Sequence, residues 1–178
     1  MAAICVFCAS SEQIDPKYVL LAEEVGTRLA AGGHTLVSGG ARVSMMGAVA
    51  RAARAGGAHT VGVMPQVLID IEVGDVESDE LTIVDTMRAR KQLMDDRSDV
   101  FVVLPGGIGT FEELFEVWTA GSIGLHTKPV FVLDPDGFYD PLWTYLESLV
   151  DKGFVRQHAL DYLRRVSTVD ELFTVIEA

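Results

Sequence analysis

The chain has 178 residues, with 14 lysines and arginines against 26 aspartates and glutamates, so its formal net charge is −12. Hydrophobic residues make up 49% of the sequence, which is typical of a globular protein, and the length predicts a single domain over residues 1–178. The acidic charge disfavours duplex nucleic acid as a partner, because binding it needs a broad basic surface. No apolar run is long enough to span a bilayer, so we expect no membrane partner either.

Short apolar runs alternate along the chain with longer amphipathic segments. Strands are predicted at Ala3–Ala9, His34–Ser38, His59–Met64, Leu81–Val84, Val100–Leu104 and Pro129–Leu133. Helices are predicted at Pro16–Ala31, Met45–Ala55, Thr86–Asp96, Phe111–Ala120, Pro141–Lys152 and Asp170–Glu177. The strands are rich in valine and isoleucine without alternation, which is typical of a parallel sheet buried on both faces. The order of the elements predicts an α/β fold, a doubly wound parallel sheet in a three-layer α/β/α arrangement.

Two features of the N-terminal third bear on the first helix and on the role of the cysteines. Pro16 at the start of the first helix and the glycines after its end are placed as helix termini favour. Cys5 and Cys8 lie three residues apart in the first strand, which puts them on opposite faces. We therefore expect two reduced structural cysteines, with no redox pair and no metal site, in a cytoplasmic protein without a signal peptide.

Three segments are candidates for the loops around a site, since ligands of doubly wound sheets bind beyond the carboxyl ends of the strands. Asp70–Glu80 contains six carboxylates and is predicted to be a solvated loop, or alternatively a rim of the site. Ser38–Gly47 and Pro105–Glu113 are glycine-rich turns between a strand and a helix. Glycine lets a ligand approach the main chain, and a helix N-terminus attracts anions such as phosphate. The alternative is a pair of tight turns that bind nothing.

Neither turn carries a common nucleotide-binding motif. Glu112 stands where a dinucleotide fingerprint would have its third glycine, and the first turn lacks the Gly-Lys-Ser/Thr ending of a P-loop. Thr110 and Glu113 have the spacing of a capping box, which is a structural device. On a helix whose core stripe is Phe111, Leu114, Phe115 and Trp118, however, Glu113 points away from the stripe, so it is also a candidate catalytic carboxylate.

The predicted helix over Thr86–Asp96 carries a cluster of cations. Met87 and Met94 define its apolar stripe, and Arg90 and Lys91 fall on that same stripe. Such cations are costly to bury unless they pair with anions or extend their charged ends to water. The functional alternative is a cationic wall opposite the glycine turns, formed by Arg88, Arg90, Lys91 and Arg97.

These motifs together resemble the LOG family of cytokinin riboside 5′-monophosphate phosphoribohydrolases, often mislabelled as lysine decarboxylases. The resemblance rests on Pro105-Gly-Gly-Ile-Gly-Thr-x-x-Glu113 and Met87-x-x-Arg90-Lys91 and extends from Phe7-Cys-Ala-Ser-Ser11 through nearly the whole chain. It implies a Rossmann-like fold and a homodimer with sites near the interface. It also implies a small-molecule nucleotide substrate, N⁶-substituted AMP or AMP itself, hydrolysed to free base and ribose 5-phosphate without a metal or organic cofactor.

By position, the resemblance makes Arg90 and Glu113 the catalytic pair. The candidate substrate-binding residues, with the first glycine turn included, are Lys91, Gly106, Gly107, Ile108, Gly109, Thr110, Thr119, Gly39 and Gly40. Four positions depart from the usual pattern of the family, namely Ala9, Ala41, Ser44 and Arg88. They leave the catalytic pair in place and leave the preferred base open.

Three alternatives remain beside this hydrolase. The first is a non-catalytic nucleotide-binding or sensor module of the same fold, against which the presence of both Arg90 and Glu113 argues. The second is a nucleosidase for a broader range of nucleotide 5′-monophosphates. The third, a lysine decarboxylase, is disfavoured because that chemistry needs pyridoxal phosphate on a Schiff-base lysine, for which the sequence offers no apparatus. Whether Arg90 contacts the phosphate or the leaving base is also open.

Overall fold

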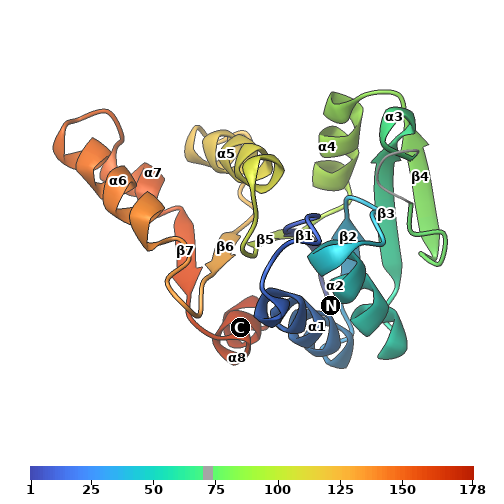
Figure 1. The fold of residues 1–178 in the computed structure, drawn as a ribbon. Coiled ribbons are helices and arrows are strands. Elements are labelled where there is room, and N and C mark those ends of the chain that lie inside the picture. The colour runs from blue at the N-terminus through green and yellow to red at the C-terminus, as the bar shows by residue number, and fades with distance from the viewer. Residues whose placement is uncertain (70–73) are drawn as a thin grey trace.

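The computed structural model describes residues 1–69 and 74–178, and in them seven strands form one parallel sheet (Figure 1). The spatial order is β4-β3-β2-β1-β5-β6-β7. The strands are β1 (Ala3–Phe7), β2 (Thr35–Ser38), β3 (Thr60–Pro65), β4 (Glu80–Val84), β5 (Val100–Val103), β6 (Val130–Leu133) and β7 (Leu163–Val166). Every neighbouring pair is parallel, which confirms the predicted α/β sheet.

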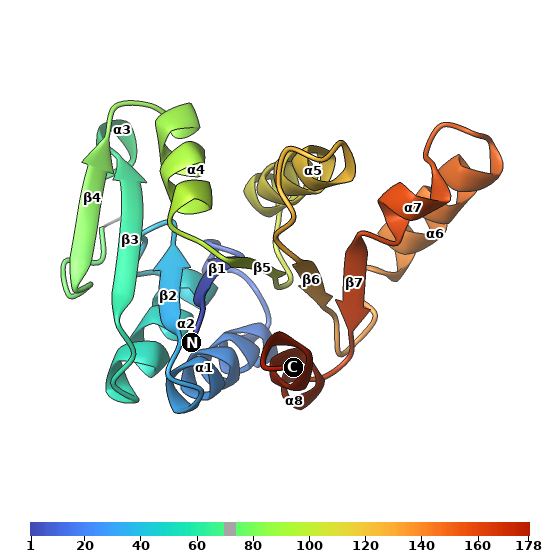
Figure 2. The ribbon, with the colours of Figure 1, turned by 180° about the vertical axis from the view of Figure 1, so that it is seen from behind.

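Helices cover both faces of this sheet (Figures 1 and 2). They are α1 (Pro16–Ala31), α2 (Ser44–Ala55), α3 (Gln66–Ile69), α4 (Met87–Asp96), α5 (Ile108–Ser122), α6 (Asp140–Asp151), α7 (Gln157–Leu160) and α8 (Val169–Ile176). One face packs against α1, α2 and α8, and the other against α4, α5, α6 and α7. The described part of the chain contains no helix with the length and hydrophobicity that a bilayer crossing requires.

The two core clusters lie on opposite faces of the sheet and share its central strands. Along β1, Ile4 and Val6 pack on the side of α1 and α2, whereas Cys5 and Phe7 pack on the side of α4 and α5. Cys8 follows on the α1 side, so the two cysteines do lie on opposite faces, and both are buried and free. Burial raises the pKa of both thiols, with the nearby Glu113 charge adding to the effect. Both thiols are therefore protonated, and the expectation of two reduced cysteines fits their burial.

The edges of the sheet differ from the sequence-based expectation. β4 is an edge strand and is only half-buried, although its apolar run had suggested burial on both faces. β7 forms the opposite edge and was not among the predicted strands, because Arg164 and Arg165 interrupt its apolar residues. The helices α3 and α7 have four residues each, too few to produce a periodic pattern.

The order of the strands creates a crevice beside β1. The chain builds β2, β3 and β4 outward on one side of β1 and then returns, so that β5 pairs with the other side of β1. The connections after β1 and β5 consequently leave the sheet in opposite directions, toward α1 below and α5 above (Figure 1). Such a switch point is where doubly wound sheets bind their ligands.

The prediction of a solvated loop before β4 holds only in part, because Glu77 and Asp79 are exposed whereas ion pairs and hydrogen bonds anchor the segment to the rest of the fold. Asp75 is buried and accepts two hydrogen bonds from Arg54 of α2, at 2.7 and 3.2 Å. Asp79 accepts from the N–H and hydroxyl groups of Thr60, which hold the pKa of its carboxyl below the usual value. Asp70 and Glu72 lie outside the described residues.

Replacing Arg54 with alanine is expected to destabilise the fold by about 3 kcal/mol, because it leaves the Asp75 carboxylate buried without its cation. Thermal or urea unfolding monitored by circular dichroism measures the change. Lys17→Ala is the matched control, since Lys17 and its partner Asp136 form an exposed pair, and its removal should leave stability almost unchanged. Equal effects of the two substitutions would contradict a structural role for the Asp75 pair.

Candidate active site

A pocket of about 240 Å³ lies at the carboxyl ends of β1 and β5, at the switch point of the sheet. Residues from the loop after β1, from α4 and from the start of α5 line it. Its lining includes six of the predicted site residues, namely Arg90, Gly107, Ile108, Gly109, Thr110 and Glu113. The structure therefore brings both predicted catalytic residues and most of the second glycine turn to one cavity.

The second glycine turn presents main chain to this pocket. Gly107 directly precedes the first residue of α5, and the N–H groups of a first helical turn have no partner within the helix. A Cβ atom built at Gly107 or Gly109 would meet no atom within 4 Å in the described part of the chain. A ligand can thus approach the positive end of α5 at close range, as a phosphate requires.

Gly106 and Thr110 have a different, internal relationship. A Cβ atom at Gly106 would lie 2.0 Å from Thr110 Oγ1, so the missing side chain makes room for the threonine. Because α5 begins at Ile108, Thr110 lies inside the helix and is buried there. The predicted capping box of Thr110 and Glu113 is therefore wrong, and the threonine instead fills the inside of the turn.

Arg90 reaches the pocket from α4 and is only 5% exposed. Its Nε donates to the carbonyl of Val63 at 3.1 Å, and its Nη2 donates to the carbonyl of Gly39 at 2.9 Å. The buried stripe of α4 is formed by Arg90 and Met94, whereas Met87 is partly exposed at the pocket. Main-chain carbonyls at the ends of β2 and β3 thus hold the guanidinium, an arrangement that sequence reasoning did not anticipate.

Glu113 enters the pocket from the opposite side, on the second turn of α5. It is half-buried and lines both this pocket and a larger neighbouring cavity. Its charge contributes to raising the pKa of the Cys8 thiol, after burial, so the carboxylate lies close to the end of β1. The buried stripe of α5 is formed mainly by Leu114, Val117 and Trp118. Glu113 points away from this stripe, as predicted, and the structure places it in the pocket lining, although Phe115 is more exposed than expected.

Comparison with known proteins agrees with these motifs. A family described as "Possible lysine decarboxylase" matches residues 46–176. A cytokinin riboside 5′-monophosphate phosphoribohydrolase of Mycobacterium tuberculosis is 49% identical over 94% of this chain and 89% of its own length. One from Arabidopsis thaliana is 40% identical over 98% of this chain and 82% of its own. The chain belongs to the LOG family.

Solved structures with lower identity share the fold. A molybdenum cofactor binding protein from Rippkaea orientalis has a TM-score of 0.75 at 20% identity, covering 98% of this chain and 94% of its own. A molybdenum cofactor carrier protein from Chlamydomonas reinhardtii has a TM-score of 0.72 at 20% identity, with the same coverage. At this identity the likeness concerns the architecture, and it confirms the Rossmann-like arrangement of the sheet and helices.

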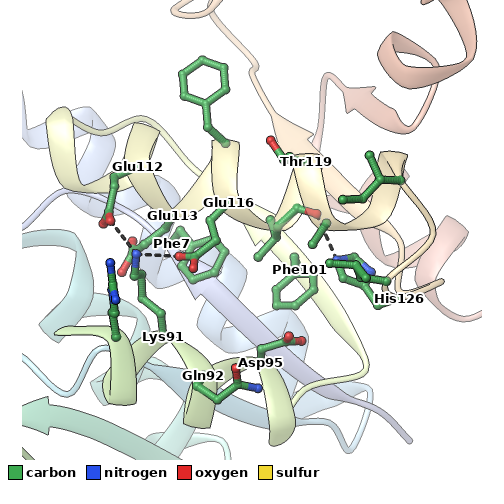
Figure 3. Close-up of a pocket in the computed structure, with 16 residues that line it drawn as sticks. Phe7, Lys91, Gln92, Asp95, Phe101, Glu112, Glu113, Glu116, Thr119 and His126 are labelled. Atoms are coloured by element: carbon green, nitrogen blue, oxygen red, sulfur yellow. Dashed lines mark hydrogen bonds and ion pairs between the residues drawn. The ribbon is translucent and has the colours of Figure 1, made fainter. Parts of the chain in front are cut away.

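Two of the substrate-binding positions inferred for the LOG family lie in the neighbouring cavity of about 960 Å³ between α4 and α5 (Figure 3). Lys91 bridges Glu112 and Glu116 of α5 there, at 2.5 and 2.6 Å. Burial acts to lower the pKa of Lys91, but these two carboxylates outweigh it and raise the pKa above its usual value. Thr119 is exposed at the far end of the same cavity. The structure does not bring either residue to the smaller pocket.

The first glycine turn does not line the pocket and contributes to it through Arg90. Gly39 offers its carbonyl to Arg90, and Gly40 adopts a φ of +76° and donates to Ser38 Oγ at 3.3 Å. The predicted wall of four cations is wrong, because Arg97 pairs with Glu80 at the edge of the sheet and Arg88 lines the larger cavity. Arg90 is the member of that group that lines the glycine-turn pocket.

Sequence reasoning missed part of the pocket lining. Ser10 and Ser11 follow β1, Met46 comes from α2 and Leu68 from α3. The two serines directly follow the predicted strand Ala3–Ala9, and the carboxyl end of a parallel strand is where ligands bind, so their position along the chain could have indicated them. The methionine and leucine carry no local signal, because an apolar side chain on a helix is ordinarily part of the core.

Tyr139 supports the second glycine turn from below. Its hydroxyl donates to the carbonyl of Leu104 at 2.7 Å, directly before Pro105, and its ring packs edge-on against Phe111. Burial, with a contribution from Asp134, raises the pKa of this phenol, so it stays protonated and able to donate. The hydrogen bond fixes where β5 ends and the turn begins.

Tyr139→Phe keeps the ring and removes this hydrogen bond. We expect a stability loss of about 1 kcal/mol and a several-fold higher KM for nucleotide, with a smaller change in kcat. Steady-state kinetics and thermal unfolding measure both quantities. Tyr162→Phe is the control, because its hydroxyl donates to the carbonyl of Lys128 at 2.9 Å, away from the turn. A KM that rises equally in both variants would show that the tyrosine does not position the turn.

Proposed function

We propose that this protein hydrolyses the N-glycosidic bond of cytokinin riboside 5′-monophosphates, which are N⁶-substituted AMP, or of AMP itself. Water attacks the anomeric carbon, the bond from this carbon to the base nitrogen breaks, and the base leaves with a proton. The products are the free base and ribose 5-phosphate. The names of the relatives that are 40 to 49% identical over nearly the whole chain support this reaction.

One observation carries the proposal. Arg90 of α4 and Glu113 of α5 line the same pocket, together with the exposed main chain of Gly107 and Gly109. Phosphate binding alone does not need a carboxylate, which repels an anion. The combination of an anion-binding turn with a neighbouring acid therefore favours a reaction in which positive charge develops on the sugar.

The roles follow from the chemistry of each group. The N-terminus of α5 holds the 5′-phosphate, and this remote binding energy orients the ribose. Glu113 stabilises the developing positive charge at the anomeric carbon, or orients and deprotonates the attacking water. Arg90 holds the phosphate or assists the departing base. The reaction draws on these side chains without a metal or organic cofactor.

We also propose that the protein forms a homodimer and that it is located in the cytoplasm. Support for the dimer comes from apolar side chains around the larger cavity, where Ile123 and Leu125 are 66% and 75% exposed beside Phe115. Two buried thiols that are not joined in a disulfide fit a reducing compartment. Analytical ultracentrifugation would give twice the chain mass for the dimer and the chain mass of 19.3 kDa for a monomer.

The decisive experiment is incubation of the pure protein with AMP and with isopentenyl-AMP, in the presence of a chelator. Chromatography should detect free base and ribose 5-phosphate in equal amounts. Nucleoside and inorganic phosphate would instead indicate a phosphatase. Tight binding of the nucleotide with full recovery of the substrate would indicate a binding module and would overturn the proposal. Release of CO₂ from lysine would support the decarboxylase suggested by the description of the family.

A further inference from the structure

Gly39 directly follows β2, and its carbonyl accepts the hydrogen bond from Arg90 Nη2. We propose that Gly39 is a positioning residue for the reaction, because its carbonyl holds the Arg90 guanidinium and its missing Cβ makes room for it. This inference rests on the proposed function only where it is tested by kcat/KM, since the contact between Gly39 and Arg90 does not depend on which substrate is bound. It gives Gly39 a role through Arg90, in place of the direct contact with substrate predicted from the sequence.

The space at Gly39 is filled by the arginine. A Cβ atom there would lie 1.8 Å from Arg90 Nη2 and 2.8 Å from Arg90 Cζ, both far below a van der Waals contact. Met46 Cε lies between these two in distance, at 2.6 Å. Backbone conformation is not the reason for this glycine, because Gly40 has a positive φ and Gly39 does not. A larger residue at position 39 therefore fits only if the guanidinium moves.

Two hydrogen bonds fix the orientation of that guanidinium. Nε donates to Val63 and Nη2 donates to Gly39, so one edge of the planar group faces the ends of β2 and β3. The remaining nitrogen, Nη1, lies 3.9 Å from the sulfur of Met87, which lines the pocket. Since the group is planar, two anchored nitrogens also determine where Nη1 points.

The turn that carries Gly39 cannot easily retreat from an added methyl group. The carbonyl of Gly40 accepts from Asp75 N–H at 2.8 Å, and Ala41 forms an isolated bridge with Gly74. Asp75 is in turn held by Arg54. The guanidinium is the end of a flexible side chain, so it is the group that moves. Gly39→Ala should therefore displace Arg90 while the fold persists.

The test is a double-mutant cycle with Gly39→Ala and Arg90→Ala, measured with the better of AMP and isopentenyl-AMP. Displacing a reacting group by about 1 Å can cost about 100-fold in rate, and we expect Gly39→Ala alone to lower kcat/KM by at least about tenfold. Arg90→Ala removes the atom nearest to the added methyl group, and Met46 Cε at 2.6 Å is the end of a flexible side chain, so no further loss is expected in this background.

A structural readout separates this inference from the proposed function. The Arg90 Nε–H group is buried and hydrogen-bonded, so its NMR signal in arginine-labelled protein should exchange slowly with solvent. Gly39→Ala should shift this signal and speed its exchange. A protein without activity on any nucleotide would remove the proposed function, and this NMR comparison would still decide the role of Gly39.

Gly56→Ala is the matched control. A Cβ at Gly56 would lie 2.5 Å from the Cβ of Ala30, so this substitution also crowds a packed position, but between α1 and α2. It should cost stability and leave both kcat/KM and the Arg90 signal unchanged. The proposal is overturned if Gly39→Ala leaves the Arg90 signal unchanged, or if it lowers kcat/KM by the same factor with and without Arg90.

Discussion

Glu113→Gln is expected to lower the turnover of N⁶-substituted AMP by at least about 100-fold while the protein remains folded. Glutamine has nearly the same shape as glutamate, so packing around α5 is kept. It carries no negative charge, so it can neither stabilise positive charge on the ribose nor take a proton from water. The measurement is steady-state kinetics of base release, with circular dichroism to verify the fold.

Glu112→Gln is the control for this prediction. Glu112 is the neighbouring residue on α5, but its carboxylate pairs with Lys91 in the larger cavity. Its substitution removes the same charge from the same helix, and the expected turnover stays within a few-fold of the parent. Similar losses in both variants would indicate a general effect of charge on α5. Near-normal turnover in folded Glu113→Gln would leave Glu113 with a structural role only.

The arrangement of the sheet was largely predictable, because it depends on local patterns. Continuous apolar runs indicated each strand that is buried between two helical layers, such as β1 and β5. The pattern is weaker at the edges, where one side of a strand meets water. β7 has buried Leu163 and Val166 around two arginines, and this short alternating pattern does not stand out from a loop.

The site was predictable where a motif is contiguous in sequence. The glycine turn before α5 supplies Gly107, Gly109 and Glu113 to one pocket, and a helix following a strand was enough to foresee this. The partners of Arg90 were not predictable in this way. Val63 lies on β3 and Gly39 directly follows β2, and both are main-chain acceptors whose presence does not depend on residue type.

The errors in the candidate site have a common cause. The cationic wall and the capping box were both inferred from spacing along one helix. The partner of Arg97 comes from β4, and the start of α5 at Ile108 places Thr110 beyond the capping position. Spacing along a helix reports which side chains share a face, whereas the groups opposite that face are determined by the tertiary structure.

Arg90→Lys is expected to lower kcat/KM by roughly 100-fold although the positive charge is conserved. The lysine ammonium would lie at a different place from the guanidinium, and a misplacement of about 1 Å in an active site can lower the rate about 100-fold. The guanidinium uses two nitrogens on the carbonyls of Val63 and Gly39 and still presents Nη1 toward the pocket. A lysine ammonium is a single centre on a different stem, so it cannot occupy both carbonyls and also reach the ligand. Arg97→Lys, in an exposed pair with Glu80, is the control and should leave kcat/KM unchanged.

The same variant distinguishes the two roles left open for Arg90. If Arg90 holds the 5′-phosphate, the substitution should raise KM for AMP and have little effect on the slow hydrolysis of adenosine, which has no phosphate. If Arg90 assists the departing base, kcat should fall by a similar factor for both substrates, because the bond that breaks is the same. Unchanged kcat/KM for AMP in a folded Arg90→Lys protein would show that one positive charge suffices, and that the orientation set by the two carbonyls does not contribute to the reaction.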